Sequence, residues 1–439
     1  MINPIRPKVL TSSYGPSAAI LRVIDHPYFV IWCFGLFFLL RALILLVPLE
    51  MSSDADWYLD RAIGISAGEG YSENGHPTAY WPVGYPGFLG GLFWLFGTSQ
   101  KVGAIANLVC ASASFFLVLA LTRHLFQNNR AARLAVALLA IYPNNIAYVP
   151  LLLTETYFTF LMLLGCYLFV VRRALPYVIM AGLVFGLMAL TKPQAVFIPG
   201  FLAILWLLTL EGRQRRWAVV ARTSLVYVMM AVVLVPWAVR NTMAFGNLVL
   251  ISTNGGGTLL SGNNPSANGG YTPNDPLVKQ RNFSVENQVA ADQRARKLAT
   301  DWITSHPGRF FALVPSKIFH AWALDGEGEW LYQRGAKSYE KYAYLFRSIR
   351  ILNQGYYALL ILGFAVAIIP LRRRRHETAW PWPLFGYMFC GYLTLIAIVF
   401  SGQSRFHFPA MPWVIMTVAW AAVHMLEKRA SNATPPHST

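Results

Sequence analysis

The chain has 439 residues, of which 56% are hydrophobic and only 13% are charged, and its formal net charge is +17. A soluble domain carries about 25% charged residues, so this composition excludes a soluble protein and predicts that lipid covers much of the surface. The net charge suggests nucleic acid at first sight. However, the basic residues gather between apolar runs, as in the cytoplasmic loops of membrane proteins. We therefore expect a lipid bilayer, and no nucleic acid, as a partner.

Apolar runs long enough to cross a bilayer predict an all-α polytopic membrane protein. A spanning helix needs about 20 residues, and about ten such transmembrane helices are expected. They lie at 28–48, 102–122, 132–150, 154–171, 175–191, 194–210, 218–238, 352–370, 381–400 and 407–426. Arginine clusters fall in every second connection, which predicts cytoplasmic termini and two large outward-facing loops.

These spans and loops divide the chain into three regions. Residues 1–238 hold the first seven spans and an acidic outer loop at 49–101. Residues 239–351 form an outward, periplasmic loop region, and residues 352–439 hold the last three spans and a cytoplasmic tail. The four arginines at 372–375 are expected on the cytoplasmic side.

Both large loops contain segments with an expected structure of their own. An apolar stretch that ends near Gly97 is too short to span and predicts a helix in the membrane interface. The Gly/Asn-rich stretch 252–265 predicts turns, and residues 285–302 predict an amphipathic helix. The apolar segment that follows, with Pro315 and Lys317, is expected to pack on the membrane surface.

Two carboxylates, Asp54 and Asp56, follow the first span directly. Carboxylates this close to the hydrocarbon edge are costly unless they have partners, and one held there can accept a proton from a hydroxyl group. A hydrated acidic turn is the alternative interpretation. An Asp-x-Asp pair can also hold a divalent cation, but three residues are weak evidence for one. No cofactor and no metal site are predicted, and a divalent metal is not excluded.

A third acid, Glu155, lies in the short outward turn between the third and fourth spans. The topology puts it on the same membrane face as Asp54, which makes it a second candidate for the chemistry. The alternative is that it only stabilises the start of a helix, where an acid is favourable.

Basic residues at the outward ends of three spans run against the expected charge bias. They are Lys192, Arg240, and Arg405 together with His407. Anchoring to lipid headgroups would explain each one singly. Their occurrence together on one face favours binding of a lipid phosphate, with which cations at the hydrocarbon edge pair well.

Two other features of the apolar runs are expected to be structural. Arg41 lies within the first span, and we expect its head to snorkel outward without a chemical role. The cysteines all fall inside apolar runs, so we expect neither disulfides nor a zinc site. They are Cys33, Cys110, Cys166 and Cys390.

The chain contains no phosphate-binding loop and no dinucleotide fingerprint. Any sugar donor would therefore have to reach the outer face already linked to lipid. A secondary transporter is one alternative, but it would place its charges near the membrane midplane. A lipid-linked oligosaccharide polymerase or ligase is another, and a structural scaffold is a third.

Several short motifs, in order along most of the chain, resemble the GT-C superfamily of membrane glycosyltransferases. The resemblance is greatest to bacterial members of glycosyltransferase family 39, relatives of the protein O-mannosyltransferases, and to the lipid A aminoarabinose transferases. The motifs lie at 54–59, 70–72, 77–86, 152–155, 191–193, 236–241, 252–256, 262–265 and 405–409.

The resemblance implies an inverting, metal-independent transfer of a sugar from a polyprenyl-phosphate carrier. The expected location is the outer face of the bacterial cytoplasmic (inner) membrane. The acceptor would be a glycolipid, a surface polysaccharide or a protein. Protein O-mannosyltransferases carry appended luminal domains that this chain lacks, which favours a glycolipid or polysaccharide.

The resemblance also implies roles for individual residues. Asp54 would be the base that activates the acceptor, although the related enzymes carry an adjacent Asp-Glu pair, so Asp56 remains the alternative. Glu155 would position the acceptor or support the base. Lys192, Arg240, Arg405 and His407 would form the site for the donor phosphate, and Tyr58, Tyr80 and Tyr85 would line the substrate cleft.

Overall fold

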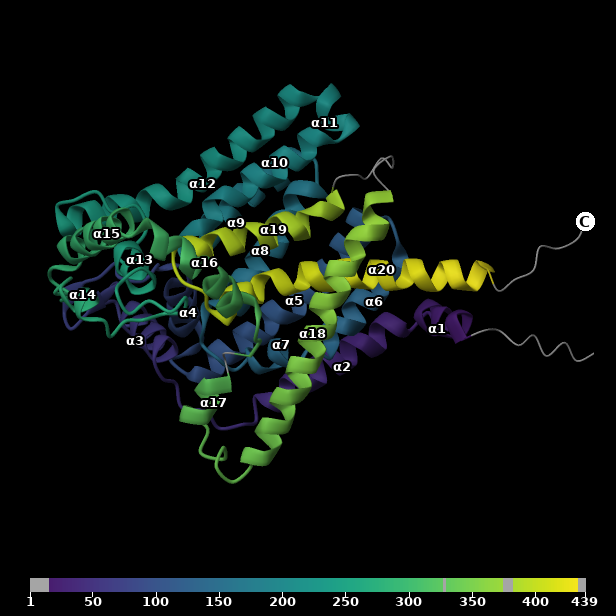
Figure 1. Ribbon diagram of the computed structural model, residues 1–439, viewed down its shortest axis with the longest axis horizontal. Helices are drawn as coiled ribbons and strands as arrows, with labels where there is room; N and C mark the ends of the chain where they lie inside the picture. Colours follow the sequence, from purple (N-terminus) through teal and green to yellow (C-terminus); the bar gives the residue numbers. More distant parts are fainter. Residues whose placement is uncertain (1–15, 327–328, 374–381, 433–439) are drawn as a thin grey trace, which may run out of the picture.

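The computed structural model describes residues 16–326, 329–373 and 382–432. It is 76% helical, so the expected all-α class is correct. The described strands form one small antiparallel hairpin, in which β1 (Ser72–Glu73) pairs with β2 (His76–Pro77). Long helices run side by side in a bundle, and α1 (Pro16–Asp25) lies beside the C-terminal end of α20 (Figure 1).

Five of the described segments are long and apolar enough to cross a membrane. They are α5 (Gln100–Phe126), α12 (Arg216–Phe245), α18 (Ala343–Arg373), η2 (Trp382–Leu384) with α19 (Phe385–Val399), and η3 (Ser404–Ala410) with α20 (Met411–Asn432). The chain is thus a multi-pass membrane protein by these criteria, with helices that reach beyond several of the expected bounds.

The remaining apolar segments are shorter or bent. A sixth span results if α1 and α2 (Phe29–Ile44), which meet at 78°, are taken as one. The shorter apolar helices are α8 (Thr154–Val170), α9 (Leu175–Thr191), and η1 (Pro193–Phe197) with α10 (Ile198–Leu208). The helix α11 (Leu210–Gln214) then leads into α12. The count of ten spans remains a prediction.

The expected single span at 132–150 is wrong. This stretch holds α6 (Asn129–Ala140) and α7 (Pro143–Ala147), which are separate helices. Pro143 has no N–H for a continuing helix, and the backbone N–H of Asn144 donates instead to Asn353 Oδ1 on α18, at 3.1 Å.

Arg41 does not snorkel outward as expected. Its side chain is fully buried, and its guanidinium donates to the carbonyl oxygens of Leu139 and Ala140 and to Asn145 Oδ1, at 2.6–3.1 Å. The last carbonyls of a helix have no partner within it, so Arg41 caps α6 from the neighbouring α2.

The 49–101 region packs against the bundle through α3 (Asp54–Ser66) and α4 (Gly84–Phe96). Gly84 lies against the end of α9, where an added Cβ would come within 2.6 Å of the Thr191 backbone nitrogen. The tip of α4 exposes Trp94 and Phe96, at 72% and 70%. Large exposed aromatic side chains suit a membrane interface, where the location of α4 remains a prediction.

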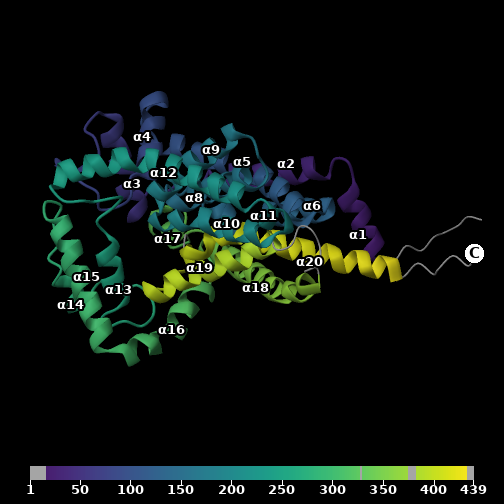
Figure 2. The same cartoon turned by 90° about the horizontal axis from the view of Figure 1, so that it is seen from above.

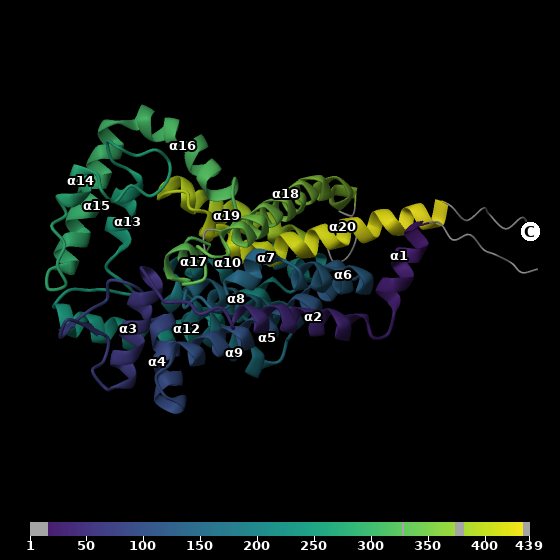
Figure 3. The same cartoon turned by 90° about the horizontal axis from the view of Figure 1, so that it is seen from below.

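The 239–351 region contains α13 (Gly255–Gly262), α14 (Pro276–Lys279), α15 (Gln288–Ser305), α16 (Pro307–Trp322) and α17 (Glu329–Gly335). In Figures 2 and 3, α13 to α16 lie together at one end of the molecule, and α16 returns towards α19. The expected amphipathic helix is α15, displaced by three residues towards the C-terminus.

The prediction of turns throughout 252–265 is wrong, because residues 255–262 form α13. Its glycines serve close packing instead of turn formation. A Cβ at Gly256 would fall on the Asp292 carbonyl oxygen of α15, and one at Gly262 would fall on the Phe400 carbonyl oxygen after α19. Only glycine allows a helix to approach two other segments so closely.

The segment that contains Lys317, which was expected to pack on the membrane surface, also makes contacts in the protein interior. Lys317 is fully buried, and its Nζ donates to Asn263 Oδ1 at 2.7 Å and to the Ile398 carbonyl oxygen at 2.9 Å. The α16 helix therefore joins the end of α13 to the end of α19, just before η3. Figure 1 shows this junction beside the bundle.

The end of the third expected region lies outside the described residues. The α18 helix ends at Arg373, so the arginines at 374 and 375 and the expected cytoplasmic tail at 433–439 are not described. The sidedness of the arginine clusters remains a prediction.

Candidate functional site

Four of the expected site residues meet at one place, where α3, α8, α9 and η3 come together. Arg405 donates from Nη1 to Asp54 Oδ2 at 2.7 Å, and its Nε lies 3.9 Å from Glu155 Oε1. Lys192 Nζ donates to the same Glu155 oxygen at 3.0 Å. We call Asp54, Glu155, Lys192 and Arg405 the charge cluster. It holds two carboxylates and two cations, so its formal charges cancel.

Glu155 forms the buried centre of the charge cluster. Its side chain is 1% exposed, and a carboxylate removed from water in this way requires opposite charges nearby. Lys192 and Arg405 provide them. Glu155 is also the second residue of α8, where the helix dipole favours an acid. Its position therefore fits the start of a helix, and its part in the chemistry remains a prediction.

Lys192 is positioned by the end of α9. The proline that follows disfavours helical backbone at the residue before it, and Lys192 accordingly has extended backbone angles, φ −141° and ψ 109°. Its side chain turns to Glu155 and keeps 13% exposure. The contact of Gly84 with Thr191 places the 77–86 segment directly beside this lysine.

Asp54 and Asp56 have different surroundings. Asp54 opens α3 after Ser53, whose φ of +57° is uncommon for a residue with a side chain. Asp56 lies two residues further along α3, so its side chain is rotated by about 200° around the helix axis relative to that of Asp54. It points away from the charge cluster and is exposed. Asp54 keeps 24% side-chain exposure while bonded to Arg405. The structure therefore brings Asp54, and not Asp56, into the charge cluster.

His407 does not join the charge cluster, although η3 carries it two residues after Arg405. It is buried at 2% and its ring nitrogens contact the Ala321 carbonyl oxygen at 2.6 Å and Asp325 Oδ1 at 3.1 Å. Trp322 and Tyr357 stack on its two faces. Binding of the donor phosphate by His407 is wrong for this arrangement, because neither nitrogen is accessible.

Asp325 is a residue that the sequence analysis missed. Its carboxylate also accepts hydrogen bonds from the Tyr142 hydroxyl at 2.6 Å, from Asn353 Nδ2 at 3.2 Å and from Asn144 Nδ2. We call Asp325, His407 and these three residues the buried network. The sequence feature that could have identified Asp325 is its position as a lone acid at the end of an apolar segment, since such a residue requires partners.

Arg240 is also held elsewhere. Its guanidinium donates to the carbonyl oxygens of Tyr71 at 2.6 Å and Thr78 at 2.8 Å, and it lies over the Trp237 ring. These bonds fix the β-hairpin loop to α12. The structure therefore does not bring Arg240 together with Lys192 and Arg405.

The three tyrosines expected to line a cleft also differ. Tyr58 and Tyr85 are buried, at 4% and 0%, and the Tyr85 hydroxyl donates to Asn107 at 3.2 Å. Burial, followed by the negative charge of Asp54, raises the pKa of the Tyr58 hydroxyl. These two rings are packed in the interior, whereas Tyr80 is only half-buried. A substrate cleft lined by the three tyrosines remains a prediction.

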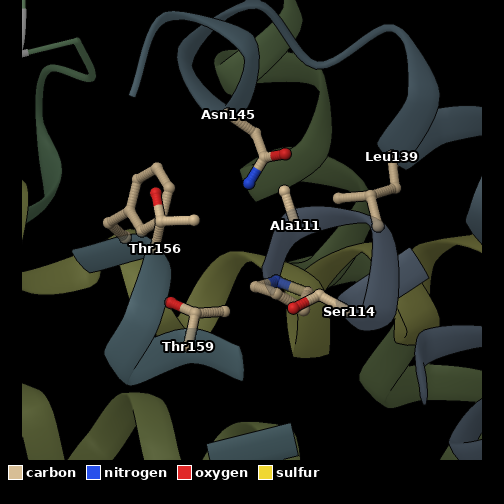
Figure 4. A pocket seen from close by; sticks show the side chains of 8 residues that line it. Ala111, Ser114, Leu139, Asn145, Thr156 and Thr159 are labelled. Atoms are coloured by element: carbon tan, nitrogen blue, oxygen red, sulfur yellow. The ribbon is translucent and has the colours of Figure 1, made fainter. Parts of the chain in front are cut away.

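A small cavity is lined by residues of α5, α6, α7, α8, η3 and α20 (Figure 4). Its volume is about 10 Å³, which accommodates about one water molecule, so it is too small for a sugar. Thr156 and Thr159 face it from α8, and the Thr159 hydroxyl has no hydrogen-bond partner in the described part of the chain. Within residues 16–326, 329–373 and 382–432, no group of three or more His, Cys, Asp or Glu side chains could hold a metal ion.

Comparison with known proteins relates this geometry to a family and a fold. Residues 81–239 match the family model described as dolichyl-phosphate-mannose-protein mannosyltransferase. This range contains Glu155 and Lys192 and ends just before Arg240. No curated protein matches the chain.

Among solved structures, the chain is similar to the oligosaccharyltransferase of Archaeoglobus fulgidus. In a complex with Zn and sulfate, that protein matches with a TM-score of 0.55 and 16% identity over 91% of this chain and 49% of its own length. The same archaeal enzyme, AglB, with an inhibitory peptide and a dolichol-phosphate, matches with a TM-score of 0.53 and 15% identity, over 94% of this chain and 52% of its own. This chain thus spans about half the length of these proteins, and the likeness establishes a shared fold.

A third match is ArnT from Cupriavidus metallidurans bound to undecaprenyl phosphate. Its TM-score is 0.42 and its identity 14%, over 94% of this chain and 79% of that one.

Proposed function

We propose that the chain is a membrane glycosyltransferase of the GT-C superfamily, which transfers a sugar from a polyprenyl-phosphate carrier to an acceptor. The acceptor would be a glycolipid, a surface polysaccharide or a protein. The reaction would take place at the outer face of the bacterial cytoplasmic membrane. The observation that carries the proposal is the charge cluster, in which Asp54, Arg405 and Lys192 are partly exposed around the buried Glu155.

The proposed reaction is a single displacement. The acceptor hydroxyl oxygen forms a bond to the anomeric carbon, and the bond from that carbon to the phosphate oxygen breaks. The electron pair of the broken bond leaves with the lipid phosphate, and the hydroxyl proton passes to Asp54. Such a displacement inverts the anomeric centre and needs no metal, although a divalent ion beside the phosphate is compatible with it.

Lys192 and Arg405 are the cations proposed to stabilise the departing phosphate. Fixed positive charges aimed at the point where negative charge develops lower the barrier for a leaving group of this kind. Both already contact Glu155, which is too buried to meet an acceptor. Glu155 is therefore proposed as the residue that positions the two cations, and Arg240 would support the site only through the 71–78 loop.

Donor binding and the availability of Asp54 are coupled in this proposal. Asp54 accepts a hydrogen bond from Arg405 at 2.7 Å. A bound phosphate would compete for the same guanidinium. Binding of the donor would therefore release the Asp54 carboxylate to face the acceptor hydroxyl.

The test is transfer by the purified full-length chain in lipid vesicles. Polyprenyl-phosphate sugars would be supplied with envelope glycolipids, and products would be weighed by mass spectrometry. A gain of one sugar mass supports the proposal, and a gain of a whole oligosaccharide identifies the polymerase or ligase alternative. Movement of donor or solute across the vesicle with no new glycosidic bond would overturn it in favour of a transporter.

A further inference from the structure

Aromatic rings connect the outer 239–351 region to the helix that carries Asp54. Phe283, between α14 and α15, contacts Tyr80 with ring centroids 4.7 Å apart. Tyr80 contacts Trp81 at 5.2 Å, and Trp81 contacts Tyr58 at 6.5 Å. Tyr58 lies one turn after Asp54 on α3. This run of rings leads from the outer region to the charge cluster.

Arg281 lies at the outer end of these rings with an available guanidinium. Its Cζ is 5.2 Å from the centre of the Phe283 ring. An added Cβ at Gly257 would come within 2.5 Å of its Nη1, so the guanidinium rests on the backbone of α13. Among the described residues, no carboxylate lies within salt-bridge distance of Arg281 and its guanidinium has no hydrogen-bond acceptor. Lys192 and Arg405, by contrast, are both paired with acids.

Tyr271 is a further exposed aromatic residue near Arg281 and Asp54. Its segment is fixed by the bond from Gly402 N–H to the Gly269 carbonyl at 2.8 Å and by that from Thr272 N–H to the Ser261 carbonyl at 2.9 Å. Burial raises the pKa of the Tyr271 hydroxyl, and the charges of Arg281 and Asp54 act on that pKa in opposite directions. Tyr271 is therefore within electrostatic range of both, and half of its surface is exposed.

We propose that Arg281, Phe283, Tyr80 and Tyr271 form a subsite for an anionic saccharide, which presents its acceptor hydroxyl to Asp54. The apolar C–H face of a sugar ring packs well on aromatic rings, and the planar guanidinium binds a carboxylate or phosphate through two hydrogen bonds. Arg281 lies between α14 and α15, which stand apart from the bundle (Figure 2), whereas Lys192 follows α9 and Arg405 lies on η3. Two separate cationic positions suit two substrates, a lipid-linked donor and a charged acceptor. The assignment as acceptor site rests on the proposed function.

The experiment measures saccharide binding by the full-length protein in detergent, with no donor present. The probes are glucuronate and glucose 6-phosphate, and glucose is the neutral control. Their binding is measured by calorimetry or by tryptophan fluorescence. We expect both anionic sugars to bind about tenfold more tightly than glucose and to lose this advantage at high salt. A difference between the two anionic probes distinguishes a carboxylated acceptor from a phosphorylated one. Equal binding of all three sugars would overturn the proposal.

Three variants locate the effect. Arg281→Gln should abolish the preference for anionic sugars. Gly257→Ala keeps the charge but displaces the guanidinium, so it should weaken the preference while leaving glucose binding unchanged. Lys297→Gln, which removes an exposed cation elsewhere on α15, should have no effect. Melting curves check that each variant is folded, and a folded Arg281→Gln protein that keeps the preference would refute the subsite.

Asp54→Asn separates this proposal from the proposed function. Because binding is measured without a donor, Asp54→Asn should keep the preference for anionic sugars. If the preference is present but no transfer to any acceptor is found, the subsite stands and the transferase fails. If transfer occurs without the preference, the transferase stands and the subsite fails.

Discussion

The short helix η3 contributes one residue to each of two contacts with an acid, and the two contacts have opposite surroundings. Arg405 meets Asp54 with 22% and 24% of their side chains exposed. His407 meets Asp325 with 1% of each side chain exposed. The first pair is accessible from outside the protein, and the second is not. Under the proposed function, Arg405 therefore takes part in the chemistry, whereas His407 supports the architecture.

The His407 contacts show why the buried pair must stay intact. Both ring nitrogens face acceptors, a carbonyl oxygen and a carboxylate. Loss of either member leaves buried polar atoms without a partner, whereas the exposed pair can turn to water.

The largest expected effect follows from removing the buried acid. Asp325→Ala should lower the free energy of unfolding by about 3–5 kcal/mol, because it leaves the buried donors of Tyr142, Asn144 and Asn353 without their shared acceptor, at about 1–3 kcal/mol for each such group. The measurement is unfolding in detergent micelles by heat or denaturant. Asp54→Ala is the matched control, and it should change stability by less than about 1 kcal/mol because its pair is partly exposed. Equal losses in the two variants would contradict the distinction between the pairs.

The second effect is on turnover. Asp54→Asn keeps the size of the side chain but cannot accept a proton, so turnover should fall by at least about a hundredfold, the common contribution of a general base. Asp56→Asn removes the same charge from the exposed side of α3 and should remain active. Steady-state transfer assays with saturating donor test this. If Asp56→Asn is inactive and Asp54→Asn is active, Asp56 is the base. If both variants are active, the acidic loop is only a hydrated turn and neither residue is the base.

The difference between the two pairs also marks what the sequence could predict. The alternation of apolar runs and arginine clusters placed Asp54, Glu155, Lys192 and Arg405 on one face, and the structure brings these four together. The sequence pattern could not show that His407 points away from Arg405. The direction of a side chain on η3 depends on packing against residues that are far apart in the sequence. Asp325 was missed for the same reason.

The glycines of α13 illustrate a second limit. The composition of 252–265 is typical of turns, and the same glycines instead allow α13 to touch α15 and the end of α19. Close helix contact and tight turns both require a missing side chain. Only the surrounding structure distinguishes them, so local composition predicted the wrong element here.

The third effect is on donor binding. A charge-assisted hydrogen bond to phosphate contributes about 1.5–3 kcal/mol, which corresponds to about a ten- to hundredfold change in affinity. Lys192→Met should produce this loss in the binding of polyprenyl phosphate. Lys192→Met leaves the buried Glu155 carboxylate with Arg405 as its remaining cation in the charge cluster, which could itself disturb folding. The double variant Lys192→Met with Glu155→Gln removes this unbalanced charge and therefore serves as the check on folding. Arg240→Met should lower stability and leave the affinity unchanged. If Arg240→Met loses affinity for polyprenyl phosphate and Lys192→Met does not, the phosphate site lies at α12 and not in the charge cluster.

The last expected effect concerns Lys317, a buried cation near η3 with no carboxylate partner among the described residues. Burial lowers the pKa of Lys317 to about 8, below its usual value of about 10.4. Between these two pH values the unfolded chain binds a proton that the folded protein does not hold. Stability should therefore rise as the pH increases from about 8 towards 10, by about 1.4 kcal/mol for each unit by which the pKa is lowered in the folded protein.

Lys317→Met should remove this rise while filling the same space. The measurement is the melting temperature as a function of pH for both proteins, and the difference between the two curves isolates Lys317 from other groups that titrate in this range. The opposite slope, a loss of stability above pH 8 that disappears in Lys317→Met, would mean that the ammonium is stabilised by its contacts with Asn263 and Ile398. In that case a buried cation on this side of η3 would need no acid, and the contrast with His407 and Asp325 would fail.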